Sequence, residues 1–140
     1  MIILDTNILI SALIRGSVTR RIIIESGFDF AYPEISMQEL LRHKKYILEK
    51  SGYIEKEFEA IISKILEYIN LVPMDIINPN LQEAKAIMKE IDVDDAVFLA
   101  AAIALDKAMI WSEDKDFERQ HKVKTVKAAD MIKFFERSKT

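Results

Sequence analysis

The sequence predicts an α/β fold, a three-layer sandwich in which a short parallel sheet of four or five strands is flanked by helices. Short apolar segments such as 1–5 and 108–112 have the composition of strands that are buried on both faces. Longer segments with apolar residues at helical spacing lie between them. This alternation of strands and helices is typical of a parallel sheet covered by helices.

Local signals place each element in turn. Thr6 and Asn7 are good helix starters after the first strand, while Gly27 and Gly52 end two of the helices. Segment 75–80, which contains a proline, is expected to be a soft spot between elements. The strands are expected over 1–5, 28–32, 71–74, 108–112 and 124–126, and the helices over 8–14, 18–26, 35–50, 54–70, 81–90, 94–105 and 128–137.

Composition restricts the chemistry. A chain of 140 residues without a linker or repeat is expected to form one domain over 1–140. With no cysteine and two histidines, any metal must be held by oxygen ligands, which favours Mg²⁺ or Mn²⁺. A net charge of −3 argues against a protein that simply coats nucleic acid. No signal peptide or membrane span is recognisable, so the expected location is cytoplasmic.

Acidic side chains follow the carboxyl ends of two predicted strands. Asp5 comes directly after the first strand, and Asp114 follows the strand over 108–112. In open α/β sheets the site lies outside these strand ends, so the two carboxylates converge if the strands are neighbours. Asp5 is also typical of a helix N-cap, and Asp114 with Asp116 of a solvated turn. However, a buried carboxylate at the end of a central strand is costly unless a cation or several donors meet it.

Two further acidic segments open predicted helices. Ser36 and Glu39 match the Ser-x-x-Glu capping box, and Glu39 reaches a site only if it points inward. Asp92, Asp94 and Asp95 precede the almost wholly apolar run AVFLAAAIAL, which is typical of a helix buried all round. A cap followed by an acidic first turn also explains these aspartates. Carboxylates gathered at the mouth of a buried helix nevertheless repel one another, and a divalent cation relieves that repulsion.

Four segments of the chain resemble PIN domains, the fold of VapC-type toxins: IILDTNIL, ISMQELLRHK, DVDDAVFLAAAIALDKAMIWSEDKDF and VKTVKAADMIKFF. They keep the order and spacing of the family over essentially the whole chain, and DAVFLAAAIAL followed by IWSEDKDF is the most diagnostic stretch. The resemblance implies a PIN-like sandwich that hydrolyses phosphodiester bonds with one or two Mg²⁺ or Mn²⁺ ions as its cofactor.

The resemblance also implies roles for individual residues. Four acids correspond to the catalytic, metal-holding positions: Asp5, Glu39, Asp95 and Asp114. The expected supporting residues are Asn7, Ser112 and Asp116, while Asp92 and Asp94 compete with Asp95 for the third position. Asp95 fits that position best because Ala and an alternation of aliphatic and aromatic residues follow it.

Basic residues close to these acids in the sequence are candidate phosphate contacts, although a solvated helix face explains them equally well. They are Arg15, Arg20, Arg21, Arg42, Lys44 and Lys45. The expected partners are an RNA substrate and, by analogy with the family, a cognate antitoxin protein and a second copy of the chain in a homodimer.

The sequence therefore predicts a Mg²⁺- or Mn²⁺-dependent endoribonuclease, with the toxin of a type II toxin–antitoxin pair as its biological role. Two alternatives stay open. A non-catalytic PIN-like module that binds RNA or protein is disfavoured because all four acids are present. A different Mg²⁺-dependent phosphate hydrolase is disfavoured because enzymes with an aspartyl nucleophile commonly carry a second Asp two residues later, where this chain has Asn7.

Overall fold

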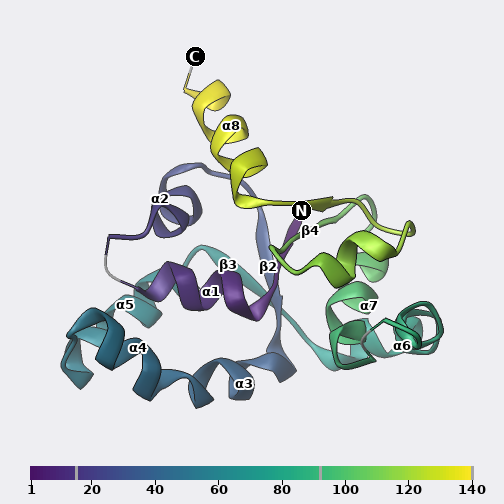
Figure 1. Ribbon diagram of the computed structural model, residues 1–140, viewed down its shortest axis with the longest axis horizontal. Helices are drawn as coiled ribbons and strands as arrows, with labels where there is room; N and C mark the ends of the chain where they lie inside the picture. Colours follow the sequence, from purple (N-terminus) through teal and green to yellow (C-terminus); the bar gives the residue numbers. More distant parts are fainter. Residues whose placement is uncertain (15, 92, 140) are drawn as a thin grey trace.

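A parallel β-sheet forms the centre of the computed structural model, which describes residues 1–14, 16–91 and 93–139 (Figure 1). The described residues form five strands in the order β3-β2-β1-β4-β5, all parallel to their neighbours. They are β1 (Ile2–Leu4), β2 (Phe30–Pro33), β3 (Ile69–Val72), β4 (Met109–Trp111) and β5 (Thr125–Val126). The predicted fold class is confirmed.

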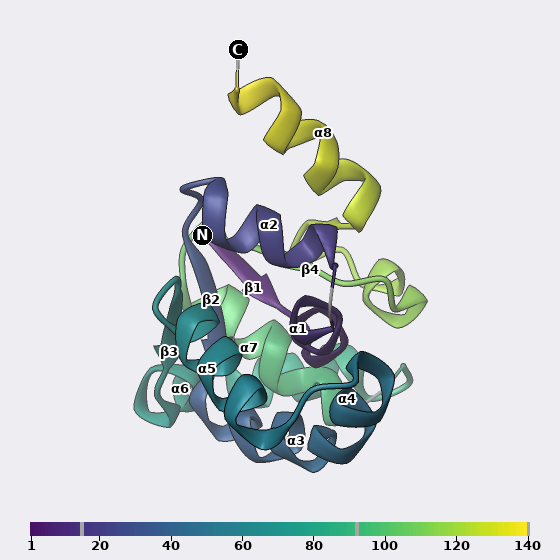
Figure 2. The ribbon, with the colours of Figure 1, turned by 90° about the vertical axis from the view of Figure 1, so that its left-hand side faces the viewer.

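Helices cover both faces of this sheet. The α-helices are α1 (Thr6–Leu13), α2 (Val18–Glu25), α3 (Met37–Arg42), α4 (Lys44–Ser51), α5 (Glu55–Leu66), α6 (Met74–Met88), α7 (Ala96–Ala104) and α8 (Ala128–Ser138), and the short 3-10 helices are η1 (Glu34–Ser36), η2 (Val93–Asp95) and η3 (Lys115–Arg119). Figure 2 shows β1 between α2 on one side and α7 on the other. Helix α7 contacts β1, β2 and β4, and α6 packs on α7.

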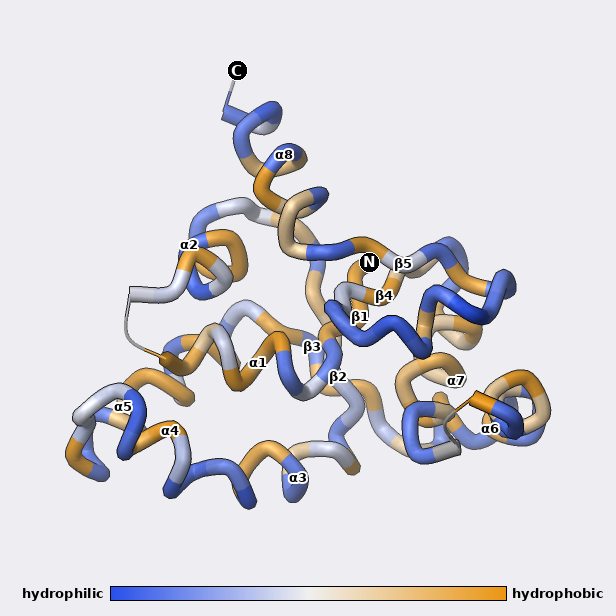
Figure 3. Tube along the Cα trace, in the orientation of Figure 1, coloured by the Kyte–Doolittle hydropathy of each residue, from blue (hydrophilic) through white to orange (hydrophobic). Residues whose placement is uncertain are grey.

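The central strand and the buried helix follow directly from composition. All three residues of β1 are buried, and the strand pairs with both β2 and β4. Helix α7 is coloured as mostly hydrophobic in Figure 3, in contrast to the hydrophilic segment between β4 and β5. A helix without a polar face has to be enclosed, and its packing between the sheet and α6 achieves this.

The helix predicted over 35–50 is divided in the structure, and this prediction was wrong in detail. Helix α3 ends at Arg42 and α4 begins at Lys44, with His43 between them. The His43 ring explains the break, because its Nδ1 lies 2.9 Å from the carbonyl oxygen of Glu39. In a continuous helix that carbonyl accepts the backbone N–H of residue 43, which here points to Leu40 instead.

The predicted soft spot at 75–80 is also wrong, because these residues belong to helix α6. Pro79 lies inside this helix, where it removes one backbone hydrogen bond. Burial of Ile77, Ala84 and Met88, together with the extensive contact between α6 and α7, offsets that loss. Tertiary packing therefore overrides the local signal of the proline.

The boundary between α5 and β3 differs from the prediction as well. The helix expected over 54–70 ends at Leu66, so Ile69 and Asn70 belong to the strand. Parallel pairing with β2 places Ile69 opposite Phe30, and the Asn70 side-chain amide donates to the Phe30 carbonyl at 3.1 Å.

None of the helices in 1–14, 16–91 and 93–139 combines the length and apolar character that a bilayer span requires.

Candidate metal centre

The carboxyl ends of β1 and β4 meet at the point where the strand order reverses. Leu4 lies opposite Trp111, and the backbone N–H of Asp5 donates to the Trp111 carbonyl at 3.1 Å. Ser112 directly follows β4. Its hydroxyl donates to Oδ2 of Asp5 at 2.7 Å and accepts a hydrogen bond from the backbone N–H of Asp114 at 2.9 Å. The convergence of Asp5 and Asp114 expected from the strand-end rule is therefore present.

Asp5 is a carboxylate held largely out of water. Only 6% of its surface is exposed, and although it occupies the N-cap position of α1, its side chain makes no regular capping hydrogen bond. Burial raises the pKa of Asp5, and the negative charge of Asp114 adds to this effect. The Ser112 hydroxyl and the nearby amides of Thr6 and Asn7 act in the opposite direction. Burial and the charge of Asp114 therefore disfavour the charged form of Asp5, and these hydrogen bonds only partly offset that effect.

Three more carboxylates gather beside this strand edge. Oxygen atoms of Asp95, Asp114 and Asp116 all lie within 4.8 Å of one another, and each side chain is half-buried. Asp95 comes from the start of α7, where it makes no side-chain capping bond, and the other two come from the segment after β4. Asp114 also accepts the backbone N–H of Asp116 at 2.9 Å, so the turn expected as an alternative for this pair does exist.

The remaining acidic candidates are placed differently. Glu39 is exposed and is not a member of the three-aspartate group, and Ser36 makes no capping hydrogen bond, so the predicted capping box is not formed. Asp94 is exposed next to Asp95. Asp92 lies outside the described residues. Of the candidates in the described residues, the structure thus groups Asp95, Asp114 and Asp116, and it links Asp5 to Asp114 through Ser112 without including Asp5 in that group.

The comparison with known families decides what kind of protein carries this arrangement. The sequence model of the PIN domain matches residues 3–132. The chain belongs to the PIN domain family. No curated protein matches the sequence. PIN domains are generally metal-dependent nucleases that act on nucleic acid, so the family places this chain among the hydrolases of phosphodiester bonds.

The donor set of this PIN domain fits a hard divalent cation. Asp95, Asp114 and Asp116 each offer a carboxylate oxygen, and such ligands suit Mg²⁺ or Mn²⁺. Oxygens on opposite sides of an octahedral Mg²⁺ lie about 4.2 Å apart, so oxygens that lie within 4.8 Å of one another are near enough to share one ion. A cation beside Asp5 would act against the burial that raises the pKa of this carboxyl, because it favours the charged carboxylate.

Three aromatic rings pack against one another next to the segments that carry the acidic residues of the PIN domain. Tyr32 lies 6.1 Å from Phe98, and Phe98 lies 6.4 Å from Phe117 in an edge-on arrangement, measured between ring centroids. Phe98 follows Asp95 by one turn of α7, and Phe117 directly follows Asp116. All three rings are buried, so they fix the spacing between β2, α7 and η3.

The Tyr32 hydroxyl joins two further parts of the site. It lies 2.8 Å from the Thr6 hydroxyl, which follows Asp5, and donates to the carbonyl of Ser36 at 2.9 Å, just before the helix that carries Glu39. Burial raises the pKa of Tyr32, and the charges of Glu39 and Asp5 add to the shift. Sequence analysis missed this residue because its partner is 26 residues away and no local pattern marks it.

The basic candidates divide into structural and exposed residues. Arg20 is structural, because its guanidinium donates to the last carbonyls of α1 and to the Tyr53 hydroxyl. Lys44 pairs with Glu55 at 3.2 Å, and Arg21 pairs with Glu25. Arg42 and Lys45 are exposed and keep the surface position that phosphate contact requires, whereas Arg15 lies outside the described residues.

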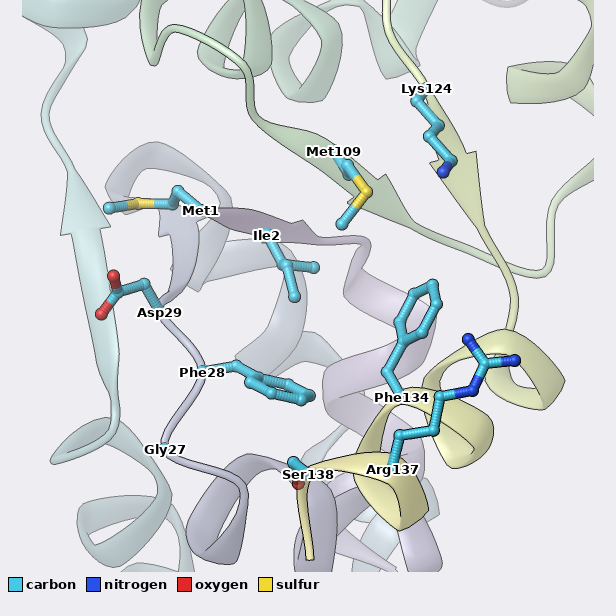
Figure 4. A pocket seen from close by; sticks show the side chains of 10 residues that line it. All are labelled: Met1, Ile2, Gly27, Phe28, Asp29, Met109, Lys124, Phe134, Arg137 and Ser138. Carbon is cyan, nitrogen blue, oxygen red and sulfur yellow. The ribbon is translucent and has the colours of Figure 1, made fainter. Parts of the chain in front are cut away.

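A cavity of about 720 Å³ lies at the other edge of the sheet, away from these acids. Figure 4 shows the rings of Phe28 and Phe134 facing this space, with Ile2 and Met109 beside them. Ile2 and Met109 begin their strands, so the cavity lies at amino ends, whereas the aspartates lie at carboxyl ends. Its volume alone does not identify it as the functional site, because ligands of open α/β sheets bind at the carboxyl ends of the strands.

The raised pKa of Asp5 predicts that the stability of the metal-free protein depends on pH. Because its folded pKa is raised above 3.8, the folded state binds more protons than the unfolded state just above that pH. The free energy of unfolding is therefore expected to fall as the pH rises from about 3.8 through the folded pKa, and to lose this component in Asp5→Asn. Urea denaturation in EDTA at a series of pH values measures both proteins. Parallel pH profiles for the two would contradict the assignment.

Proposed function

We propose that this PIN domain is a Mg²⁺- or Mn²⁺-dependent endoribonuclease and the toxin of a type II toxin–antitoxin pair. The observation that supports the chemistry most is the group of Asp95, Asp114 and Asp116 beside the buried Asp5, at the carboxyl ends of β1 and β4. Membership of a family of metal-dependent nucleases supports hydrolysis of a phosphodiester bond. The resemblance of the sequence to VapC-type toxins supports RNA as the substrate and the toxin role.

The residues have distinct roles in this proposal. Asp5, Glu39, Asp95 and Asp114 would hold the cation, and Asp116 and Ser112 would support them. A divalent ion held by these residues would supply a water molecule of lowered pKa and positive charge against the scissile phosphate. Ser112 donates to Oδ2 of Asp5 and so fixes the orientation of this carboxylate. Asp94 and Asp92 are not needed as ligands once Asp95 occupies the third position.

Several wider proposals follow from the family resemblance alone. The chain acts as one PIN domain over 1–140, in the cytoplasm, as a homodimer whose activity a cognate antitoxin protein suppresses. Gel filtration of the purified chain tests the dimer, and co-expression with the product of the neighbouring gene tests the antitoxin.

The deciding experiment is cleavage of a structured RNA by the purified chain in millimolar Mg²⁺ or Mn²⁺, beside the same reaction in EDTA. Cleavage that EDTA abolishes is the expected result. RNA binding without cleavage in either metal would indicate a non-catalytic module instead. Hydrolysis of a generic phosphomonoester in place of RNA would indicate a different phosphate hydrolase.

The same preparation gives a test of the metal site that does not depend on activity. At a metal concentration about 100 times Kd, binding stabilises the folded state by about 2.7 kcal/mol, which raises the melting temperature by roughly 5–10 °C. Asp75→Asn, which changes an exposed aspartate in the first turn of α6, serves as a control variant. Its melting temperature should rise in metal as that of the wild type does. An unchanged melting temperature in millimolar metal would argue against the site.

A further inference from the structure

The cavity of about 720 Å³ at the amino ends of β1 and β4 lies next to the second half of α8. Its apolar lining comes from three parts of the chain. Ile2 and Met109 begin the two strands, Phe28 precedes β2, and Phe134 belongs to α8. We call this space the α8 cavity. It lies at the opposite ends of the strands from the candidate metal centre, and the proposed function gives it no role.

The α8 cavity has the size and lining of a site for a small molecule. Such sites commonly measure about 300–1,000 Å³ and combine mostly apolar walls with a few polar groups. Phe28 and Phe134 are half-buried, and Figure 4 shows both rings facing the space. An apolar or aromatic body bound there would cover the exposed parts of both rings. Figure 2 shows α8 projecting from the rest of the molecule, so such a ligand would also hold α8 against the sheet.

Positive charge lies on one side of the α8 cavity. Figure 4 shows Lys124 and Arg137 on that side, with Asp29 across the space from them. The Lys124 side chain is exposed and makes no ion pair within the described parts of the chain. An anionic group beside Lys124 would therefore gain a partner without breaking an existing ion pair.

An adjoining cavity of about 520 Å³ adds further positive charge around Lys124. The two cavities share Met109 and Lys124 in their linings. The charged lining residues of the second cavity are three lysines and one aspartate, namely Lys107, Lys122, Lys124 and Asp106. Lys122 pairs with Glu83 at 3.4 Å, but cations still outnumber anions in the combined lining. This excess attracts anions to the side of the α8 cavity on which Lys124 lies.

We propose that the α8 cavity binds a small amphipathic anion. An apolar or aromatic body lies against Phe28 and Phe134, and a carboxylate, sulfate or phosphate group lies beside Lys124 and Arg137. The excess of positive charge disfavours a cationic ligand, and a neutral ligand gains nothing from the lysine. The inference goes beyond the proposed function and does not depend on it, because the aspartates of the candidate metal centre do not line this cavity.

The test uses two fluorescent probes in EDTA. Anilinonaphthalene sulfonate is an anion with an aromatic body, and phenylnaphthylamine carries the same rings without the charge. The wild type is expected to bind one molecule of the anionic probe, and its melting temperature is expected to rise with probe concentration. Lys124→Gln weakens the affinity for the anion about 2- to 5-fold, as expected for one exposed charge pair, and leaves the affinity for the neutral probe unchanged. Lys133→Gln is the matched control, because it removes an exposed charge of α8 outside the lining and changes neither affinity.

Phe134→Ala tests the aromatic wall of the α8 cavity. The substitution removes one of the two rings, so both probes are expected to bind about 2- to 10-fold more weakly. Ile132→Ala is the control for general loosening of α8, since Ile132 is also half-buried on this helix but does not line the cavity. It should bind both probes as the wild type does. An equal loss of affinity in Ile132→Ala would overturn the assignment of the ring.

Four results would overturn the proposal as a whole. The first is equal affinity of the anionic probe for the wild type and Lys124→Gln, and the second is an equal loss in Lys133→Gln, which would indicate attraction to the net charge of the surface. The third is a melting temperature that falls with probe concentration, because the probe then binds the unfolded chain. The fourth is a dimer in gel filtration that Phe134→Ala dissociates, which would make a second copy of the chain the occupant.

Asp5→Asn separates this proposal from the proposed function. The variant is expected to bind both probes as the wild type does, whether or not the wild type cleaves RNA, because Asp5 lies at the carboxyl end of β1. Failure of the RNA cleavage assay therefore leaves the probe measurements valid. Loss of probe binding in Asp5→Asn at an unchanged melting temperature would place the probe at the metal centre and overturn the inference.

Discussion

Asp5→Asn is expected to abolish metal-dependent RNA cleavage while the protein stays folded. Asparagine has the shape of aspartate and still accepts the Ser112 hydrogen bond, but it lacks the charge that holds a divalent cation. Removal of a residue that only orients a metal ligand lowers metal affinity or activity about 10- to 100-fold. Loss of a ligand itself is expected to lower activity by more than this. Steady-state cleavage in Mn²⁺, with circular dichroism as the check on folding, measures the effect.

The stability of Asp5→Asn gives a second, independent test of Asp5 as a metal ligand. In EDTA at neutral pH, Asp5→Asn is expected to be more stable than the wild type, because the neutral amide removes a buried charge that faces Asp114. In saturating metal the order reverses, since only the wild type gains binding energy. Asp75→Asn removes an exposed carboxylate and should show neither effect. Wild-type cleavage rates in Asp5→Asn would rule out Asp5 as a ligand.

Tyr32→Phe is expected to weaken metal binding about 10- to 100-fold although Tyr32 belongs to no acidic cluster. The substitution removes only the hydroxyl that contacts Thr6 and donates to Ser36. The turns that carry Asp5 and Glu39 are then no longer tied together. The buried groups left behind also cost about 1–3 kcal/mol of folding free energy. Titration of Mn²⁺ by calorimetry and urea denaturation measure the two effects.

Tyr53→Phe is the matched control for Tyr32→Phe. Tyr53 is also buried, and its hydroxyl accepts a hydrogen bond from Arg20, which binds the carbonyls at the far end of α1 from Asp5. It should lose stability by a similar amount but keep its affinity for Mn²⁺. If both variants lose metal affinity equally, the effect is general loosening and not positioning. Thr6→Val combined with Tyr32→Phe should cost less than the sum of the two single variants, because both remove the same contact.

Segments whose local pattern agrees with their packing could be predicted from the sequence. The run Ile2–Leu4 reads as a buried strand and is one, and the amphipathic helix expected over 128–137 is α8 to within one residue. Convergence of Asp5 and Asp114 was also predictable, because parallel strands place their carboxyl ends at one edge. These features depend on periodicity and on a general rule of sheet geometry.

Features that depend on distant partners were not predictable in the same way. The break at His43 depends on where its ring finds a carbonyl, and helix α6 continues through Pro79 because α7 packs against it. Local propensity measures neither effect. For the same reason Tyr32, whose hydroxyl meets residues on two other turns, had no recognisable signal in the sequence.

By itself the sequence determined the fold class, the PIN family and which aspartates stand at strand and helix ends, because these follow from residue order. Only the tertiary structure decided which carboxylates meet. It brought Asp116 together with Asp95 and Asp114 and left Asp94 and Glu39 exposed. The physical reason is that direction and burial of a side chain depend on the packing of α7 and η3 against the sheet, which spans residues far apart in the chain.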